Sequence, residues 1–118
     1  MVINQGDLYW IQLDNSGEPE PGIPHPYVVV QENLFNHSRI HTVIVCALTS
    51  NIHRANLPGN VLLEPGEGSL PRQSVVEVSK ISSIEKTQLG AYIGSLDGQR
   101  VQQILAGLRF LQTSFFPR

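Results

Sequence analysis

Short runs of β-branched and aromatic residues, separated by segments rich in glycine and proline, constrain the fold of this chain more than any other feature. Val, Ile, Tyr and Trp favour the pleated surface of a strand, whereas Gly and Pro interrupt strands and form turns. Such regular spacing of short strands predicts an antiparallel sheet or a small barrel. The predicted strands are GDLYWIQL (6–13), PYVVVQE (26–32), TVIVCALT (42–49), NVLLE (60–64), SVVEV (74–78) and KISSI (80–84), the last two joined by a tight link. In the first of these, Leu8, Trp10 or their neighbours are expected to face inward.

The C-terminal segment 97–116 changes to a helical period. Its apolar residues recur at steps of three and four, which places them in one stripe of an amphipathic helix, and Asp97 is a suitable N-cap. Because the polar face lacks the Lys/Arg-rich character of a membrane-surface helix, we expect the stripe to dock on the sheet. The predicted fold is mainly β, an antiparallel β-barrel with a C-terminal α-helix, and residues 1–118 form a single domain. The stripe consists of Val101, Ile104, Leu105, Leu108, Leu111 and Phe115.

Charge and cysteine content narrow the function classes. With 8 Lys+Arg against 10 Asp+Glu, the net charge of -2 argues against a protein that coats nucleic acid non-specifically, although it allows a local cationic groove. The single cysteine, Cys46, lies in an apolar run and is expected to be an inert buried thiol. No signal peptide or membrane-spanning segment is visible, so we expect a cytoplasmic protein without membrane contact.

His25 stands between Pro24 and Pro26, where a Gly/Pro-rich loop (15–26) meets a predicted strand. Thr49 ends the strand predicted at 42–49. If these two strands pair antiparallel, His25 and Thr49 lie at the same end of the barrel. An imidazole exchanges protons near neutral pH, and a hydroxyl can donate a hydrogen bond to a phosphoryl oxygen. The spacing thus indicates a candidate catalytic pair, and it leaves open an exposed loop histidine beside an ordinary strand end.

Metal-binding and general catalytic motifs are absent from the sequence. There is no glycine-rich phosphate loop, HExxH or paired CxxC. His37 and His41 are four residues apart, which would align them on a helix, but His41 leads directly into a predicted strand. We therefore predict no metal site and no cofactor.

Four segments, in order and consistently spaced, resemble the MazF/PemK family of toxins. QGDLYWIQL resembles the family's (R/K)GD(I/V)Y/W…L signature, GEPEPGIPHPYVVVQEN its G.E…RP..V(I/V)QN element, and TVIVCALTSN its TVIV.(P/A)(I/L)TS element. NLPGNVLLEP and GSLPRQSVVEVSKISSIEKTQL follow the family's later segments, so the resemblance spans nearly the whole chain.

The resemblance implies an SH3-like barrel, a homodimer and the toxin half of a type II toxin–antitoxin pair. It also implies a metal-independent endoribonuclease that cleaves single-stranded RNA, often mRNA, at short sequence motifs. The ribose 2′-hydroxyl attacks the adjacent phosphate and leaves a 2′,3′-cyclic phosphate and a 5′-hydroxyl. The implied protein partner is a cognate antitoxin, whose disordered tail folds into the RNA groove at the dimer interface.

Transferred by position, the family's catalytic threonine falls on Thr49 and its catalytic arginine falls on His25. The histidine is a departure from the family pattern, because arginine is always charged and offers a fork of donors. Three consequences stay open. His25 acts as acid or base while Thr49 stabilises the phosphorane, or another cation supplies the charge, or the protein is a weakened relative that still binds its partner. The candidate cations are Arg54, Arg72 and Lys80.

Further positions are candidates for RNA contact. Glu20 matches an acidic loop residue of the family and could orient the imidazole or contact a base. Gln31 and Asn33 carry amides suited to base edges. Leu57 and Pro58 match an apolar element beside the RNA groove, or form a plain turn. The predicted RNA-binding set is completed by Ser50, Gln73 and Lys80, of which Gln73, with Ser74, could instead simply open a strand.

Two other function classes compete with the nuclease. The same barrel occurs in non-catalytic toxins that inhibit DNA gyrase, and a third class would be a binding module that retains only the partner groove. The HP..VV and LTSN elements resemble the nuclease branch more closely.

Overall fold

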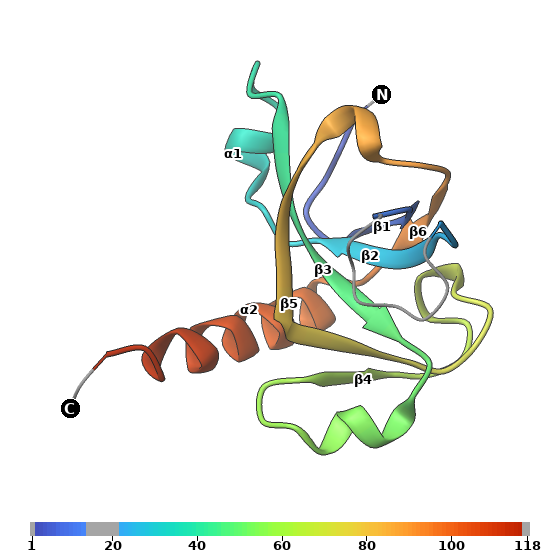
Figure 1. Cartoon of the computed structure of the whole chain (residues 1–118), viewed down its shortest axis with the longest axis vertical. Coiled ribbons are helices and arrows are strands. Elements are labelled where there is room, and N and C mark those ends of the chain that lie inside the picture. Colours follow the sequence, from blue (N-terminus) through green and yellow to red (C-terminus); the bar gives the residue numbers. More distant parts are fainter. Residues whose placement is uncertain (1, 14–21, 117–118) are drawn as a thin grey trace.

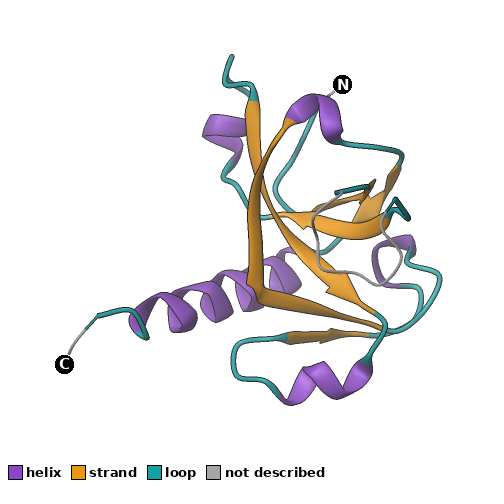
Figure 2. Cartoon of the chain, viewed as in Figure 1, coloured by secondary structure: helices purple, strands orange, loops and turns teal. Residues whose placement is uncertain are grey.

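A computed structural model describes residues 2–13 and 22–116 of the chain. Within these residues, six antiparallel strands form one sheet in the order β4-β5-β3-β2-β1-β6. The sheet curls into a half-barrel, and the longer helix, α2, lies along its outside (Figures 1 and 2). This architecture confirms the predicted antiparallel β fold with a C-terminal helix. The elements are β1 Asp7–Ile11, β2 His25–Val29, α1 Asn33–Asn36, β3 Thr42–Thr49, β4 Val61–Leu63, β5 Ser74–Glu85, β6 Tyr92–Ser95 and α2 Gly98–Thr113.

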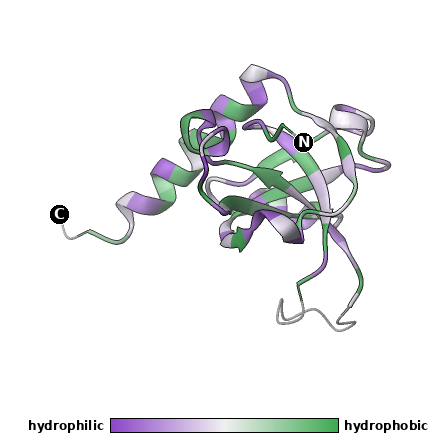
Figure 3. Cartoon of the chain, turned by 90° about the horizontal axis from the view of Figure 1, so that it is seen from above, coloured by the Kyte–Doolittle hydropathy of each residue, from purple (hydrophilic) through white to green (hydrophobic). Residues whose placement is uncertain are grey.

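The central strands are buried on both faces, which explains their unbroken apolar runs. Leu8, Val28 and Cys46 pack in one cluster together with Ile104 of α2. Their chain neighbours point to the opposite face, where a second buried cluster includes Ile84 from the far end of β5. Leu8 is therefore inward, as expected, but Tyr9 is equally buried while Trp10 is only half-buried. Figure 3 shows the corresponding concentration of hydrophobic residues along the strands.

The prediction of separate strands at 74–78 and 80–84 is wrong, because β5 runs unbroken from Ser74 to Glu85. Its first residues lie between β4 and the end of β3, and its last residues pair with the start of β3. The register shifts between Cys46 and Leu48 of β3, and β5 bends there. The exposed Ser79 and Lys80 lie at this irregularity. Because they interrupt the apolar pattern, the sequence predicts a link between two strands there.

Two elements are absent from the sequence prediction. The strand β6 pairs antiparallel with β1 at the edge of the sheet, and its Gly94 lies so close to another backbone that a Cβ there would be 2.1 Å from the Gly68 carbonyl oxygen. The short helix α1 follows β2, which ends at Val29 rather than at residue 32.

The helix α2 begins where its N-cap was predicted, since the Asp97 carboxylate accepts a hydrogen bond from the Arg100 amide at 2.9 Å. Ile104 is buried, and Val101 and Leu108 pack against the same cluster, so the docking of the stripe is confirmed. The stripe loses contact toward the C-terminus, where Phe115 is 71% exposed and the chain points away from the sheet (Figure 1). Neither helix in the described part of the chain is long and apolar enough to cross a membrane.

Candidate active site

A cavity of about 440 Å³ lies where β2 begins and β3 ends. Tyr27 pairs with Ala47 in the antiparallel register of these strands, and two further residues along each strand bring His25 opposite Thr49. The predicted placement of His25 and Thr49 at one end of the sheet is thereby confirmed. The described lining consists of Trp10, Ile23, Pro24, His25, Pro26, Leu48, Thr49, Ser50, Leu70, Pro71, Arg72 and Ser74.

The prolines on both sides of His25 explain how an imidazole is held at a loop–strand junction. His25 is the first residue of β2, is half-buried and pairs with Ile11 of β1. Pro24 and Pro26 line the cavity with it, and their rings restrict the backbone on either side. The imidazole is therefore attached to a backbone with little freedom to move away from the cavity.

The hydroxyl of Thr49 is oriented by a backbone contact at the end of β3. Its Oγ1 accepts a hydrogen bond from the Asn51 amide at 3.2 Å. Because a hydroxyl can accept and donate at once, the Thr49 proton stays available to a ligand in the cavity. Ser50, which also lines the cavity, is exposed.

Arg72 is the one of the three candidate cations that belongs to the described lining of this cavity. Arg54 and Lys80 instead approach the buried carboxylate of Glu77, with nitrogen–oxygen distances of 3.9 and 3.5 Å. Since Glu77 is only 3% exposed, its charge needs such partners. The tertiary structure thus favours Arg72 as the cation that accompanies His25.

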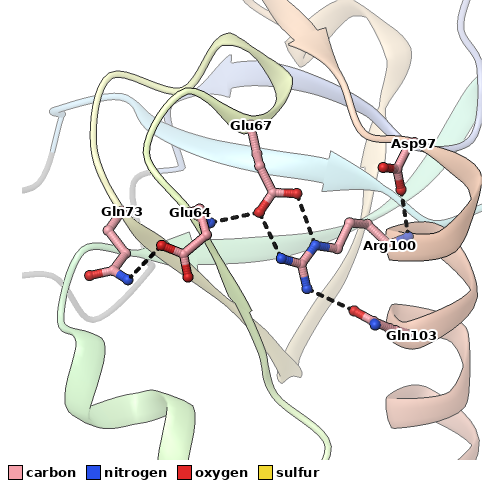
Figure 4. Close-up of polar contacts among 6 residues, drawn as sticks. All are labelled: Glu64, Glu67, Gln73, Asp97, Arg100 and Gln103. Atoms are coloured by element: carbon pink, nitrogen blue, oxygen red, sulfur yellow. Dashed lines mark hydrogen bonds and ion pairs between the residues drawn. The ribbon is translucent and has the colours of Figure 1, made fainter.

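The segment that carries Arg72 is anchored to the first turn of α2 (Figure 4). Arg100 binds the Glu67 carboxylate with two hydrogen bonds, of 2.9 Å from Nε and 2.8 Å from Nη2. Glu67 also accepts a hydrogen bond from the Glu64 amide at 2.6 Å, and Gln73 Nε2 lies 3.5 Å from the Glu64 carboxylate. The Arg100 guanidinium lowers the pKa of Glu67 below its usual value, and the carboxylate raises the pKa of Arg100. These contacts limit the movement of the segment leading to Arg72.

Gln31 and Asn33 lie at the other end of β2 and do not contribute to the cavity. Gln31 Nε2 donates to Asn36 Oδ1 at 3.0 Å, and Asn36 Nδ2 donates to the Gln31 carbonyl at 2.6 Å. Asn33 Oδ1 accepts a hydrogen bond from the Gln5 amide at 2.7 Å. Their amides thus stabilise the short helix α1 and the segment before β1.

The remaining predicted RNA contacts are dispersed. Leu57 and Pro58 follow a 3-10 turn, Ile52–Asn56, and line no part of this cavity. The side chain of Gln73 contacts the Glu64 carboxylate, and that of Lys80 contacts the Glu77 carboxylate. Glu20 lies outside the described residues.

Neither a metal cluster nor a reactive thiol is found among the described residues. No group of three or more His, Cys, Asp and Glu side chains could hold a metal ion there, and His37 Nε2 lies 2.9 Å from Asn4 Oδ1. Cys46 is fully buried, as predicted, and burial raises the pKa of its thiol to about 12, which disfavours the reactive thiolate.

Trp10 lines the cavity although the sequence analysis assigned it no functional role. It pairs with Pro26 across β1 and β2, and its half-buried side chain forms part of the cavity wall. The sequence signal that could have found it is its position, because the antiparallel pairing of β1 with β2 places Trp10 opposite Pro26, the residue that follows His25.

Comparison with known proteins identifies one family. Residues 4–111 match the family model described as PemK-like, MazF-like toxin of type II toxin–antitoxin system. The chain is 37% identical over 109 residues to Endoribonuclease MazF6 of Mycobacterium tuberculosis, covering 92% of this chain and 96% of that protein. It is 30% identical over 104 residues to Endoribonuclease EndoA of Bacillus subtilis, covering 88% of this chain and 89% of that protein.

Solved structures share the fold. An endoribonuclease in complex with its cognate antitoxin, from a mycobacterial species, superimposes with a TM-score of 0.77 at 22% identity, covering 98% of this chain and 99% of that one. MazF from Deinococcus radiodurans superimposes with a TM-score of 0.74 at 18% identity, covering 96% and 98% of the two chains.

Proposed function

The chain belongs to the PemK-like, MazF-like toxins of type II toxin–antitoxin systems, and from this premise we propose that it is an endoribonuclease that cleaves single-stranded RNA. The observation that carries the proposal is the convergence of His25, Thr49 and Arg72 on one cavity. An imidazole, a hydroxyl and a guanidinium are together sufficient to bind a phosphodiester and to move its protons.

In the proposed reaction, the ribose 2′-oxygen forms a bond to phosphorus and the bond from phosphorus to the 5′-oxygen breaks. His25 accepts the proton of the 2′-hydroxyl and returns a proton to the departing 5′-oxygen. Thr49 donates a hydrogen bond to a non-bridging oxygen, and Arg72 balances the negative charge that develops there. The products are a 2′,3′-cyclic phosphate and a 5′-hydroxyl, so no water is consumed.

In this assignment, His25 and Arg72 together take the role that the resemblance gives to a single arginine. A histidine supplies acid–base chemistry but fewer donors, whereas Arg72 keeps its charge throughout. The rigid attachment of both residues supports the division: His25 lies between prolines, and the segment of Arg72 is tied to α2 by Glu67.

The proposal extends to partners and context. The family and the antitoxin-bound mycobacterial relative support a cognate antitoxin as partner. We expect the protein to act as a single-domain homodimer in the cytoplasm and to recognise a short motif in mRNA.

The test is cleavage of a long single-stranded RNA in the presence of EDTA, with the cut ends mapped. We expect cuts at a fixed short motif with the two end groups given above. His25→Ala should lower the rate by about 10²–10⁴-fold, and Thr49→Val by about 10²-fold. His41→Ala removes an exposed histidine at the opposite end of β3 and serves as the matched control.

Four results would decide against parts of this scheme. Full activity of His25→Ala would exclude the imidazole from the chemistry, and a gain of activity in His25→Arg would mark the histidine as a degraded arginine. A rate that stays constant between pH 5 and 8, where histidine ordinarily titrates, would also contradict acid–base catalysis by His25. Gyrase inhibition without RNA cleavage would place the protein among the non-catalytic toxins.

A further inference from the structure

A second cavity, of about 640 Å³, adjoins the first. Trp10 and Pro24 contribute to the lining of both, so these two residues form the ridge between them. The rest of the described lining of the second cavity comprises Gln12, Gln88, Gly90 and Ala91.

The two cavities differ in charge. The first contains His25 and Arg72, which suit a phosphate group. The described lining of the second contains no ionisable side chain, but it has two carboxamides, from Gln12 and Gln88, and an indole. Carboxamides and flat aromatic rings recognise the edges and faces of nucleobases, which are uncharged.

The backbone of Trp10 is held on two sides. Its amide donates to the Ala91 carbonyl at 2.9 Å, and its carbonyl accepts from the Gly90 amide at 2.8 Å. A Cβ at Gly90 would lie 2.3 Å from the Trp10 carbonyl oxygen, so this approach requires glycine. On the other side, Trp10 pairs with Pro26 of β2. The indole therefore extends from a fixed backbone, and a base could stack on it without ordering a loop.

Gln88 is similarly fixed at the far side of the second cavity. Its Oε1 accepts a hydrogen bond from the Glu85 amide at 2.9 Å. The carboxamide nitrogen carries two further donors, which suit acceptor atoms on a base edge.

We propose that the second cavity binds the nucleobase adjacent to the scissile phosphate, stacked against Trp10 and contacted by Gln88. This subsite rests on the proposed endoribonuclease function, and it makes Trp10 and Gln88 determinants of the RNA motif. The bound RNA then passes over the ridge of Trp10 and Pro24. Its scissile phosphate lies in the charged cavity, and the adjacent base lies in the uncharged one.

The single tryptophan of the chain allows a direct test, because all tryptophan fluorescence comes from Trp10. The probe is a 2′-O-methyl RNA that spans the mapped cleavage site and, without a 2′-hydroxyl, is not cut. We expect it to quench the fluorescence. One abasic nucleotide beside the scissile linkage should weaken binding about tenfold for the wild type, as expected for one lost stacking contact. In the Trp10→Ala variant, the same abasic change should lower the affinity for the probe by less than about twofold. In the Trp10→Phe variant, which keeps an aromatic ring, it should lower the affinity by about tenfold, as in the wild type.

Gln88→Ala tests the second cavity without altering the ridge. We expect affinity for the probe to fall severalfold, whereas Gln102→Ala, an exposed glutamine on α2, should leave it unchanged. If Trp10→Ala does not fold, as judged by circular dichroism, the Trp10→Phe and Gln88→Ala comparisons with the abasic probes still decide the question.

The proposal is overturned if saturating probe leaves the fluorescence unchanged, or if no abasic position loses affinity in a Trp10-dependent way, while RNA cleavage persists. If instead the wild type cuts no RNA, the proposed function fails separately. A 2′-O-methyl oligouridylate then replaces the mapped probe: Trp10 quenching with weaker binding by Gln88→Ala supports the subsite, and unchanged fluorescence refutes it.

Discussion

Arg72 and His25 line one cavity although they are 47 residues apart in the sequence. At the scale of single residues, the proposed mechanism depends on this pair to stabilise a phosphorane without the family's arginine. In the proposed mechanism, the guanidinium supplies charge and paired donors, and the imidazole acts as the proton acceptor and donor.

The residue-scale prediction concerns the shape of the cation at position 72. Arg72→Ala should lower the rate of RNA cleavage by about 10²-fold, because a donor to the developing charge is lost. Arg72→Lys should recover only part of this, since lysine keeps the charge but not the planar fork. Single-turnover cleavage measures both, and Arg109→Ala, an exposed arginine on α2, is the control. Equal rates for the Arg72→Ala and Arg109→Ala variants would remove Arg72 from the mechanism.

At the scale of elements, α2 is positioned by a contact between two backbones. A Cβ at Gly107 would lie 2.1 Å from the carbonyl oxygen of Gly59, which itself has a φ of +87°. The backbone at Gly59 cannot easily move to make room for a Cβ at residue 107, because Gly59 adopts a conformation that other residues avoid. The helix can therefore approach the turn before β4 this closely only because residue 107 lacks a side chain.

Gly107→Ala should accordingly destabilise the protein, by about 2 kcal/mol in the free energy of unfolding, as typical of overpacking. Gly98→Ala is the matched control: it lies at the start of the same helix with nothing within 4 Å of the added Cβ. It should be neutral or stabilise by up to about 1 kcal/mol, because alanine restricts the unfolded chain. Urea denaturation distinguishes the two, and similar losses for both variants would mean that the Gly59 contact is unimportant.

A second element-scale prediction follows from the ion pair that ties α2 to the segment before β5. Each partner, Glu67 and Arg100, is about a quarter exposed. Glu67→Gln should therefore cost about 1 kcal/mol of unfolding free energy at pH 7. The pairing lowers the pKa of Glu67 from its ordinary value of 4.5, so the native state favours the carboxylate. The ion pair therefore contributes fully to the free energy of unfolding at pH values above 4.5. This contribution disappears as the pH falls through the lower pKa that Glu67 has in the folded protein.

Unfolding free energies of wild type and Glu67→Gln across the acidic range provide the measurement. The two curves should converge below about pH 4.5, where the carboxylate of the unfolded chain is protonated. In the Arg100→Gln background, Glu67→Gln should cost much less at pH 7. A difference between wild type and Glu67→Gln that persists unchanged in strong acid would contradict the assignment.

At the scale of the whole molecule, a net charge of -2 is compatible with the proposed RNA substrate if the cations that contact RNA are confined to one cavity. Arg72 places a positive charge in the cavity that His25 also lines, while Arg54 and Lys80 approach the carboxylate of Glu77. The curled sheet produces this arrangement, because it brings the segment before β5 over the end of β3.

The sequence by itself determined the features that depend on near neighbours. The apolar runs of β2 and β3, the helical period of α2, its cap at Asp97 and the burial of Cys46 were all readable, since each follows from local propensity and patterning. His25 and Thr49 could be paired because the register of two predicted strands was sufficient to align them. The resemblance of ordered motifs indicated the family.

Only the tertiary structure decided which distant groups meet. Arg72 was one of three equivalent cations in the sequence, and the fold places it in the cavity with His25, whereas Arg54 and Lys80 approach Glu77. Gln31 was predicted to contact a base, and the structure shows that its side-chain amide bonds Asn36. The unbroken β5 and the role of Trp10 as a ridge also depend on strand register and on close approaches between backbones. Such contacts are set by the packing of the whole sheet, and no local pattern encodes them.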